Sequence, residues 1–133
     1  MPGQSFSPPR GMRDIDPEEM AKREYVCGKI KDVLSLFGYQ LIDPTHVEKI
    51  ETIFAKAGPE IEKEIYSFED KAGRRLALRF DLTVGMARMV ANNPDWPKPL
   101  RLAAISNVWR YDEPQFGRYR SVFQWDIELF GTN

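Results

Sequence analysis

The chain has 133 residues, enough for one domain, and its 42% hydrophobic and 29% charged residues argue against a disordered or fibrous protein. Its 19 Lys and Arg residues against 20 Asp and Glu residues give a net charge of -1, so any nucleic-acid binding would need a local basic patch. Its single cysteine, Cys27, excludes a disulfide within the chain, and because no membrane-spanning run or secretory signal is found, we expect a cytoplasmic protein.

The N-terminal third predicts one long helix followed by a short strand. Asp16 precedes Pro17 and lies three residues before Glu19, which is the pattern of an N-cap, a first-turn proline and a capping box. Gly38 is placed to end this helix, and residues 39–42 then predict a strand. The apolar residues of the helix recur at helical spacing and are Val26, Ile30, Val33 and Phe37.

Two further helices are predicted in the middle of the chain. The sequence Thr45-x-x-Glu48 is a second capping box, so we expect a helix that begins at Thr45 and ends at Gly58. Its apolar stripe consists of Val47, Ile50 and Phe54. A third helix is expected to begin at Asp81 or Leu82, and its buried side consists of Leu82, Met86, Met89 and Val90.

The remaining segments predict antiparallel pairs of strands. Residues 65–68 and 76–80 flank a turn that contains Gly73, which is typical of a β-hairpin. The long runs at residues 100–110 and 121–130 predict a second pair. Helices interleaved with such pairs predict an α+β fold built around a mostly antiparallel sheet.

The last predicted strand separates polar from apolar side chains. Because side chains alternate between the two faces of a strand, Gln124, Asp126 and Glu128 share one face. The other face is apolar and consists of Phe123, Trp125, Ile127 and Leu129. Arg110 ends the preceding strand, so a guanidinium is expected near a row of amide and carboxylate groups. Periodicity alone does not decide between a functional polar face and a solvated one.

Smaller features also have a structural and a functional interpretation. Asp81 and Thr83 lie where a strand leads into a helix; an N-cap is the favoured interpretation of Asp81, and binding of an ammonium group is the alternative. The Gly-Arg-Tyr-Arg sequence at residues 117–120 could bind phosphate or form a solvated turn. The only histidine, His46, has no partner at metal-binding spacing, so no metal site in the protein chain is expected.

These segments together resemble the histidyl-tRNA synthetases, a family of class II aminoacyl-tRNA synthetases. The first helix and the strand up to Pro44 resemble motif 1, the dimer-forming element of the family. Residues 66–70 and 76–83 resemble its histidine-binding hairpin, and residues 109–128 resemble motif 2. The blocks occur in the order of the family, so the resemblance implies a class II synthetase-like sheet flanked by helices.

The resemblance also implies a role for each candidate residue. Four would bind histidine: Asp81, Thr83 and Gln124 at the α-ammonium group, and Glu128 at the imidazole. Three would bind ATP: Arg110 between the α-phosphate and the histidine carboxylate, Arg118 at the phosphates, and Asp112 at the adenine end. The implied activity is that of a histidine–tRNA ligase, which activates histidine with ATP to histidyl-adenylate and transfers it to tRNA(His). Mg²⁺ is expected to accompany ATP, and a homodimer is expected.

The chain departs from the family pattern in length. It ends directly after motif 2, so we expect residues 1–9 to be a flexible lead-in and residues 10–133 to be the N-terminal part of a catalytic domain. The third motif and the anticodon-binding domain would then be absent, the sheet would be incomplete at its C-terminal side, and the chain alone would not be fully active. Asp112 also replaces a more frequent Glu. Two alternatives stay open: a non-catalytic, histidine-sensing or regulatory paralogue, and a dimerisation module.

Overall fold

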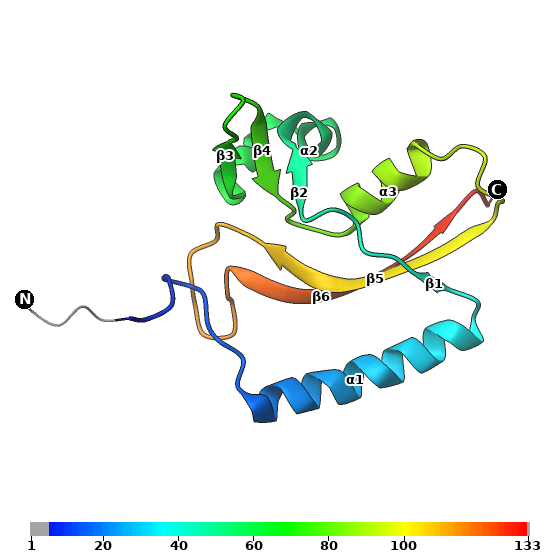
Figure 1. Ribbon diagram of the computed structural model, residues 1–133, viewed down its shortest axis with the longest axis horizontal. Coiled ribbons are helices and arrows are strands. Elements are labelled where there is room, and N and C mark those ends of the chain that lie inside the picture. The colour runs from blue at the N-terminus through cyan, green and yellow to red at the C-terminus, as the bar shows by residue number, and fades with distance from the viewer. Residues whose placement is uncertain (1–5, 133) are drawn as a thin grey trace, which may run out of the picture.

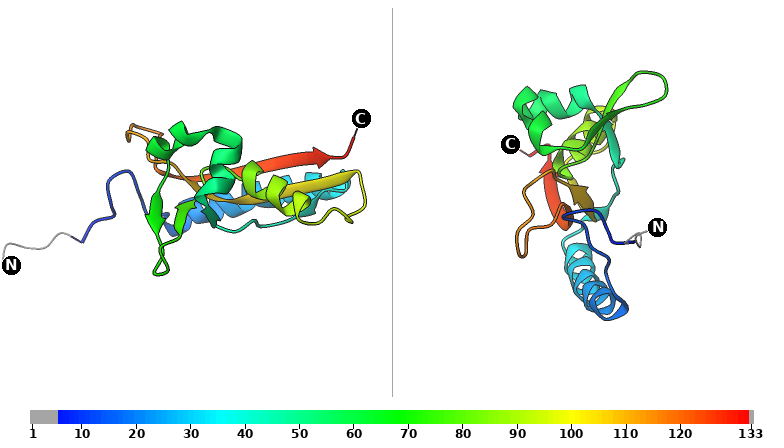
Figure 2. Two further views of the ribbon diagram at one scale, coloured as in Figure 1. Left: turned by 90° about the horizontal axis from the view of Figure 1, so that it is seen from above. Right: turned by 90° about the vertical axis from the view of Figure 1, so that its left-hand side faces the viewer.

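The computed structural model describes residues 6–132, which form two three-stranded sheets flanked by helices (Figure 1). Helix α1 runs along one side of the larger sheet, while the smaller sheet and the other helices lie on the opposite side (Figures 1 and 2). The predicted α+β class is therefore confirmed. Residues 1–5 of the predicted lead-in lie outside the described residues, and residues 6–9 contain no helix or strand. Within the described chain, no helix has the length and apolar character needed to cross a membrane.

Helix α1 spans Pro17–Leu36 and begins as the sequence predicts. A carboxylate oxygen of Asp16 accepts a hydrogen bond from the backbone N–H of Glu19 at 2.8 Å, which satisfies one of the free amides of the first turn. The side chain of Glu19, which was predicted to complete a capping box, instead binds Arg13 at 2.5 Å and so supports the segment that precedes the helix. Gly38 has a φ of 73°, a conformation that glycine adopts without strain, and the helix ends just before it as predicted.

The larger sheet has the strand order β1–β5–β6. Strands β5 (Leu100–Trp109) and β6 (Ser121–Phe130) are antiparallel along their whole length, which confirms the predicted pair. The short strand β1 (Gln40–Leu41) pairs with β5 in parallel, so the sheet is mixed. Because β5 and β6 are long and fully paired, they form a rigid base for the side chains on either face.

The smaller sheet corrects one predicted helix boundary. Its strands are β2 (Val47–Lys49), β3 (Ser67–Glu69) and β4 (Arg75–Leu78), and helix α2 covers Ile50–Ala57. The helix predicted from Thr45 thus begins at Ile50, because the residues before it pair with β4 in an antiparallel ladder. Glu48 on β2 is buried and accepts hydrogen bonds from Arg88 at 2.9 Å, a distant contact that holds the segment extended. A 3₁₀ helix, η1 (Pro59–Glu64), leads into β3.

Two apolar clusters hold the elements together. Helix α3 (Thr83–Ala91) packs on the larger sheet through Leu82 and Met86, which contact the even-numbered side of β5. The residues of β5 in this cluster are Leu100, Leu102, Ala104 and Val108. A second cluster joins α2 to the smaller sheet and consists of Ile50, Ile53, Ile65 and Ala77. The first cluster fixes the start of α3 against the larger sheet, which determines the position of Asp81.

The two faces of β6 have the reverse of the usual burial pattern. The apolar residues on the side of α1 remain between about a third and a half exposed: Phe123 at 37%, Leu129 at 45%, Ile127 at 46% and Trp125 at 53%. The polar residues of the opposite face are half-buried next to the core under α3. A half-buried polar row is unusual for a solvated strand, so the burial favours the functional interpretation of this face.

The turn of the β3–β4 hairpin contains a carboxylate, that of Asp70, whose contacts make the stability of the protein depend on pH. One carboxylate oxygen of Asp70 accepts hydrogen bonds from the backbone N–H groups of Ala72 (2.9 Å) and Arg74 (3.0 Å), and the other accepts one from the Arg74 guanidinium (2.6 Å). The backbone bond from Arg74, followed by the bond from its side chain, lowers the pKa of Asp70 below its ordinary value.

A lowered pKa in the folded state stabilises the protein above the pKa of the unfolded chain, about 3.9, and the contribution is lost as the pH falls through the folded-state pKa. We therefore expect Asp70→Asn to be less stable than the parent at pH 6, with a difference that shrinks between pH 4 and pH 2. Urea denaturation across this range measures it. A difference that stays constant with pH would contradict the assignment.

Candidate functional site

Two of the three polar side chains of β6 lie beside small side chains of β5. In the antiparallel register, Gln124 lies opposite Ser106, and Asp126 lies opposite Ala104. Gln124, Asp126 and Glu128 are all partly buried, as expected for groups at the edge of the core rather than in open solvent. The predicted sharing of one face by these three residues agrees with the paired strand geometry.

Arg110 connects this face to the loop before α3. Its Nε–H donates a hydrogen bond to the backbone carbonyl of Phe80 at 3.0 Å, and its Nη2 lies 3.5 Å from the side-chain oxygen of Gln124. The backbone N–H of Trp109 donates to the carbonyl of Arg79 at 3.0 Å, which joins the end of β5 to the end of β4. The guanidinium thus contacts Phe80, which is 30 residues before it in the sequence, and Gln124, which is 14 residues after it. The predicted nearness of Arg110 to the polar row is therefore confirmed at Gln124.

Asp126 extends the contact from Arg110 along the strand. Its Oδ2 accepts a hydrogen bond from the side-chain Nε2 of Gln124 at 2.7 Å. The amide of Gln124 therefore lies between a guanidinium and a carboxylate. Alternation along the strand placed Asp126 on the polar face, but its bond to Gln124 could not be predicted, because it depends on the orientation of both side chains.

Asp81 lies just before Leu82, the N-cap residue of α3, and its carboxylate contacts both the first turn of the helix and an ammonium group. One of its oxygens accepts a hydrogen bond from the backbone N–H of Val84 at 3.0 Å, which agrees with the capping interpretation. The other oxygen lies 3.3 Å from the Nζ of Lys56, and the Asp81 side chain is only 16% exposed. Thr83, the first residue of α3, lies beside this cap. Lys56 was not among the predicted site residues, because it is 25 residues from Asp81 and belongs to another helix.

A cavity of about 250 Å³ brings together the three candidate nucleotide-binding residues. It is lined by Ile61, Glu64, Phe80, Arg110, Asp112 and Arg118. Within it, Nε and Nη2 of Arg118 donate to one carboxylate oxygen of Asp112 at 3.1 and 3.0 Å. Two guanidinium groups at one cavity suit a polyanion such as a chain of phosphates, because each can donate two parallel hydrogen bonds.

The Gly-Arg-Tyr-Arg sequence at residues 117–120 does not form a single patch. Arg118 binds Asp112 at the cavity just described, whereas the ring of Tyr119 lies 4.7 Å from the Arg13 guanidinium. The third side chain, Arg120, donates to the backbone carbonyl of Asp112 at 2.9 Å and stacks on a neighbouring tyrosine ring. Of these arginines, only Arg118 lines the cavity with Arg110.

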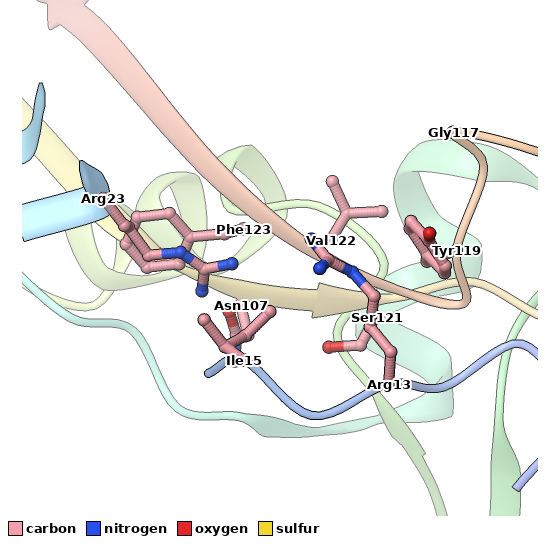
Figure 3. Close-up of a pocket in the computed structure, with 9 residues that line it drawn as sticks. All are labelled: Arg13, Ile15, Arg23, Asn107, Gly117, Tyr119, Ser121, Val122 and Phe123. Carbon is pink, nitrogen blue, oxygen red and sulfur yellow. The ribbon is translucent and has the colours of Figure 1, made fainter. Parts of the chain in front are cut away.

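A second cavity, of about 280 Å³, lies on the α1 side of the larger sheet (Figure 3). Its lining includes Arg13, Arg23, Tyr119 and Phe123, and the Arg23 guanidinium lies 4.5 Å from the Phe123 ring. Because Phe123 belongs to the odd-numbered side of β6, this cavity is separated by the sheet from the row that contains Gln124. The cavity lined by Phe123 and the polar row that contains Gln124 therefore lie on opposite faces of the larger sheet.

Acidic and histidine side chains do not gather into a metal site within residues 6–132: no group of three or more His, Cys, Asp or Glu could hold an ion there. His46 lies 3.4 Å from Asp43 and packs against Trp109 at a ring distance of 5.9 Å.

Comparisons with known proteins identify the family that the chain resembles. A family model described as histidyl-tRNA synthetase matches residues 11–133. The histidine–tRNA ligase of Pyrobaculum arsenaticum is 46% identical over 99% of this chain and 32% of its own length, and that of Aeropyrum pernix is 42% identical over 99% and 31%.

Solved structures give the same result. An ATP phosphoribosyltransferase regulatory subunit/histidyl-tRNA synthetase from Bacillus halodurans has a TM-score of 0.83 and 32% identity, over 96% of this chain and 33% of that one. The histidyl-tRNA synthetase from Nostoc sp. PCC 7120 has a TM-score of 0.81 and 29% identity, over 96% and 29%. The chain spans about a third of the length of the curated relatives it matches.

Proposed function

The chain belongs to the histidyl-tRNA synthetase family, and from this premise we propose that it supplies the histidine- and ATP-binding part of a histidine–tRNA ligase. The proposed reaction is the activation of histidine by ATP to histidyl-adenylate, followed by transfer to tRNA(His). The observation that carries the proposal is the position of Arg110, which lies between the polar row of β6 and the cavity that contains Arg118.

Histidine is proposed to bind along the polar face of β6. Its α-ammonium group would be bound by Asp81, Thr83 and Gln124, and its imidazole N–H would donate to Glu128. An ammonium group already occupies one oxygen of Asp81, that of Lys56, so the carboxylate has the charge and access that the substrate would need. Substrate binding would then displace Lys56, whose side chain is 49% exposed and free to move into solvent.

ATP is proposed to occupy the cavity lined by Arg110, Asp112 and Arg118. Arg118 would bind the phosphates and Asp112 the adenine end, which requires their ion pair to open, because the substrate would replace its contacts. Mg²⁺ is expected to arrive with the triphosphate, since this ion usually keeps several waters and binds through substrate phosphates.

The proposed chemistry needs no general base. The histidine carboxylate is ionised at neutral pH, so its oxygen can attack the α-phosphorus directly while pyrophosphate leaves with the electron pair of the broken P–O bond. Catalysis then consists of holding the reacting groups in line and stabilising negative charge. Arg110 suits this role because its planar fork can bind a carboxylate oxygen and a phosphate oxygen together and does not lose its proton.

Selectivity for histidine would come from Glu128. This carboxylate is partly buried, so an amino acid without a ring N–H would leave it without a hydrogen-bond partner. The loss of this hydrogen bond to a partly buried carboxylate would disfavour such analogues.

A homodimer and a cytoplasmic location are part of the proposal. On the side of α1, an apolar groove of about 620 Å³ lies between the helix and β6, lined in part by Val26, Val33, Phe37 and Trp125. Three of these side chains are more than half exposed: Val26 at 54%, Val33 at 53% and Phe37 at 68%, although the sequence predicts them as a packing stripe. A second copy of the protein is the occupant that the motif 1 resemblance suggests.

A histidine-sensing regulator is the second candidate function. It is supported by the similar protein from Bacillus halodurans, which is described both as a regulatory subunit and as a synthetase. Such a protein would bind histidine but would have no use for the two arginines of the nucleotide cavity.

The function is tested by ATP–pyrophosphate exchange in the full-length protein, with and without histidine. We expect exchange that depends on histidine and is not supported by phenylalanine, whose side-chain ring has no N–H group. Calorimetry separates the two candidates: binding of both histidine and ATP is expected for the ligase. Binding of histidine with no binding of ATP, together with no exchange, would instead identify the regulator.

A further inference from the structure

Asp126 has a place in the site that neither the family resemblance nor the comparisons assign. It lies on β6 two residues after Gln124 and two before Glu128, on the same face as both. It is partly buried opposite Ala104, whose small side chain leaves room for the carboxylate. None of the ion pairs formed within residues 6–132 includes Asp126; the hydrogen bond of its side chain there is the one from Gln124 at 2.7 Å.

The neighbours of Gln124 leave its side-chain amide one satisfactory orientation. A guanidinium has only donors, so the atom that faces Arg110 at 3.5 Å must be the acceptor Oε1. An ionised carboxylate has only acceptors, so the atom that faces Asp126 must be the donor Nε2. Rotating the amide by 180° would place N–H groups against the guanidinium and oxygen against the carboxylate, and would lose both contacts.

This orientation matters for the amino acid that the site is proposed to bind. An α-ammonium group needs hydrogen-bond acceptors, and Gln124 is useful to it only when Oε1 points toward the substrate and Arg110. Arg110 by itself holds the amide only weakly, at a distance of 3.5 Å, whereas the contact with Asp126 is short and charge-assisted. The stronger contact is therefore the one that sets the orientation.

We propose that Asp126 is a positioning residue that holds the side-chain amide of Gln124 with its oxygen available to the α-ammonium group of histidine. The inference rests on the proposed function, and it adds a residue that acts through Gln124 without touching the substrate. The carboxylate also adds negative charge to the row that receives the substrate ammonium group.

The test is the exchange assay on full-length protein with Asp126→Asn, a change that keeps the shape of the side chain. Because asparagine can both donate and accept, the Gln124 amide can rotate. We expect the KM for histidine to rise about tenfold, which corresponds to the loss of one hydrogen bond to a charged group. The KM for ATP and kcat should stay within about twofold, since the nucleotide cavity does not contain Asp126.

A double variant, Gln124→Glu with Asp126→Asn, serves as the rescue. Its total charge equals that of the parent, and a glutamate presents acceptors in either orientation, while the new asparagine donates to it. We expect its KM for histidine to return to within about threefold of the parent. Glu24→Gln on the exposed surface of α1 is the control for loss of one negative charge and should leave all constants unchanged.

The outcomes separate this inference from the function on which it rests. No histidine-dependent exchange in the parent protein would overturn both. With an active parent, an unchanged histidine KM in Asp126→Asn would overturn the inference alone. So would a double variant as impaired as the single one, because a structural role for the Asp126 charge would not be restored by moving that charge to position 124.

Discussion

Replacing Arg110 with alanine is expected to lower histidine-dependent ATP–pyrophosphate exchange by about a thousandfold. The guanidinium donates to the Phe80 carbonyl and reaches Gln124, so it is held where the histidine carboxylate and the α-phosphate of ATP would meet. Alanine removes the charge that offsets the negative charge developing on the reacting oxygens. Because this interaction is strongest in the transition state, kcat should fall more than KM rises.

Two variants make this result specific. Arg110→Lys keeps the charge but not the planar fork, so it should recover only part of the lost rate. Arg101→Ala removes an exposed arginine from the same strand, β5, and should leave the exchange unchanged. Full activity in Arg110→Ala would mean that the activated carboxylate is held elsewhere, and the assignment of the site would be wrong.

Replacing Arg79 with leucine is expected to lower the free energy of unfolding by about 3 kcal/mol. The Arg79 side chain is 3% exposed, although arginine is rarely buried. Its guanidinium donates to the carbonyls of Pro44 (2.6 Å) and Asn107 (2.8 Å), to the hydroxyl of Ser106 (2.5 Å) and to Asp43 (3.0 Å). Leucine would fill part of the space but leave buried acceptors without donors.

The matched variant is Asp43→Asn, which changes the carboxylate that pairs with Arg79. Partial burial alone would raise the pKa of Asp43, but hydrogen bonds from Arg79 and His46 outweigh it and lower the pKa. The Asp43 side chain is 59% exposed, so its loss should cost less than about 1 kcal/mol. Urea denaturation of both variants measures the difference. Equal destabilisation would show that the ion pair, rather than the buried carbonyl contacts, accounts for the stability.

Local physical rules were sufficient for much of the fold. The cap formed by Asp16, the helix end at Gly38 and the hairpin turn at Gly73 each depend on a few neighbouring residues, so the sequence could predict them. Alternation along β6 and its pairing with β5 depend on a periodic pattern over ten residues and were predicted for the same reason.

The start of α2 could not be predicted from local rules. The sequence Thr45-x-x-Glu48 satisfies the pattern of a helix start, yet residues 47–49 form β2. The choice depends on pairing with β4 and on the buried contact of Glu48 with Arg88, which is 40 residues further along the chain. Tertiary contacts of this kind override a capping preference worth about 1 kcal/mol.

The candidate site was also predictable only in part from the sequence. The nearness of Arg110 to Gln124 followed from strand alternation and from the end of β5. The contacts of Lys56 with Asp81 and of Gln124 with Asp126 did not, because they depend on side-chain orientation and, for Lys56, on the packing of a distant helix. The proposed roles of Thr83 and Glu128 still depend on the resemblance and require a bound substrate to test them.

The most direct test is a crystal structure of the protein with histidine and a non-hydrolysable ATP analogue. We expect histidine on the even-numbered face of β6, with its carboxylate and the α-phosphate on the Arg110 guanidinium and its imidazole on Glu128. Histidine bound on the opposite face of the sheet, near Arg23 and Phe123, or ligands bound beyond the reach of Arg110, would contradict the proposed site.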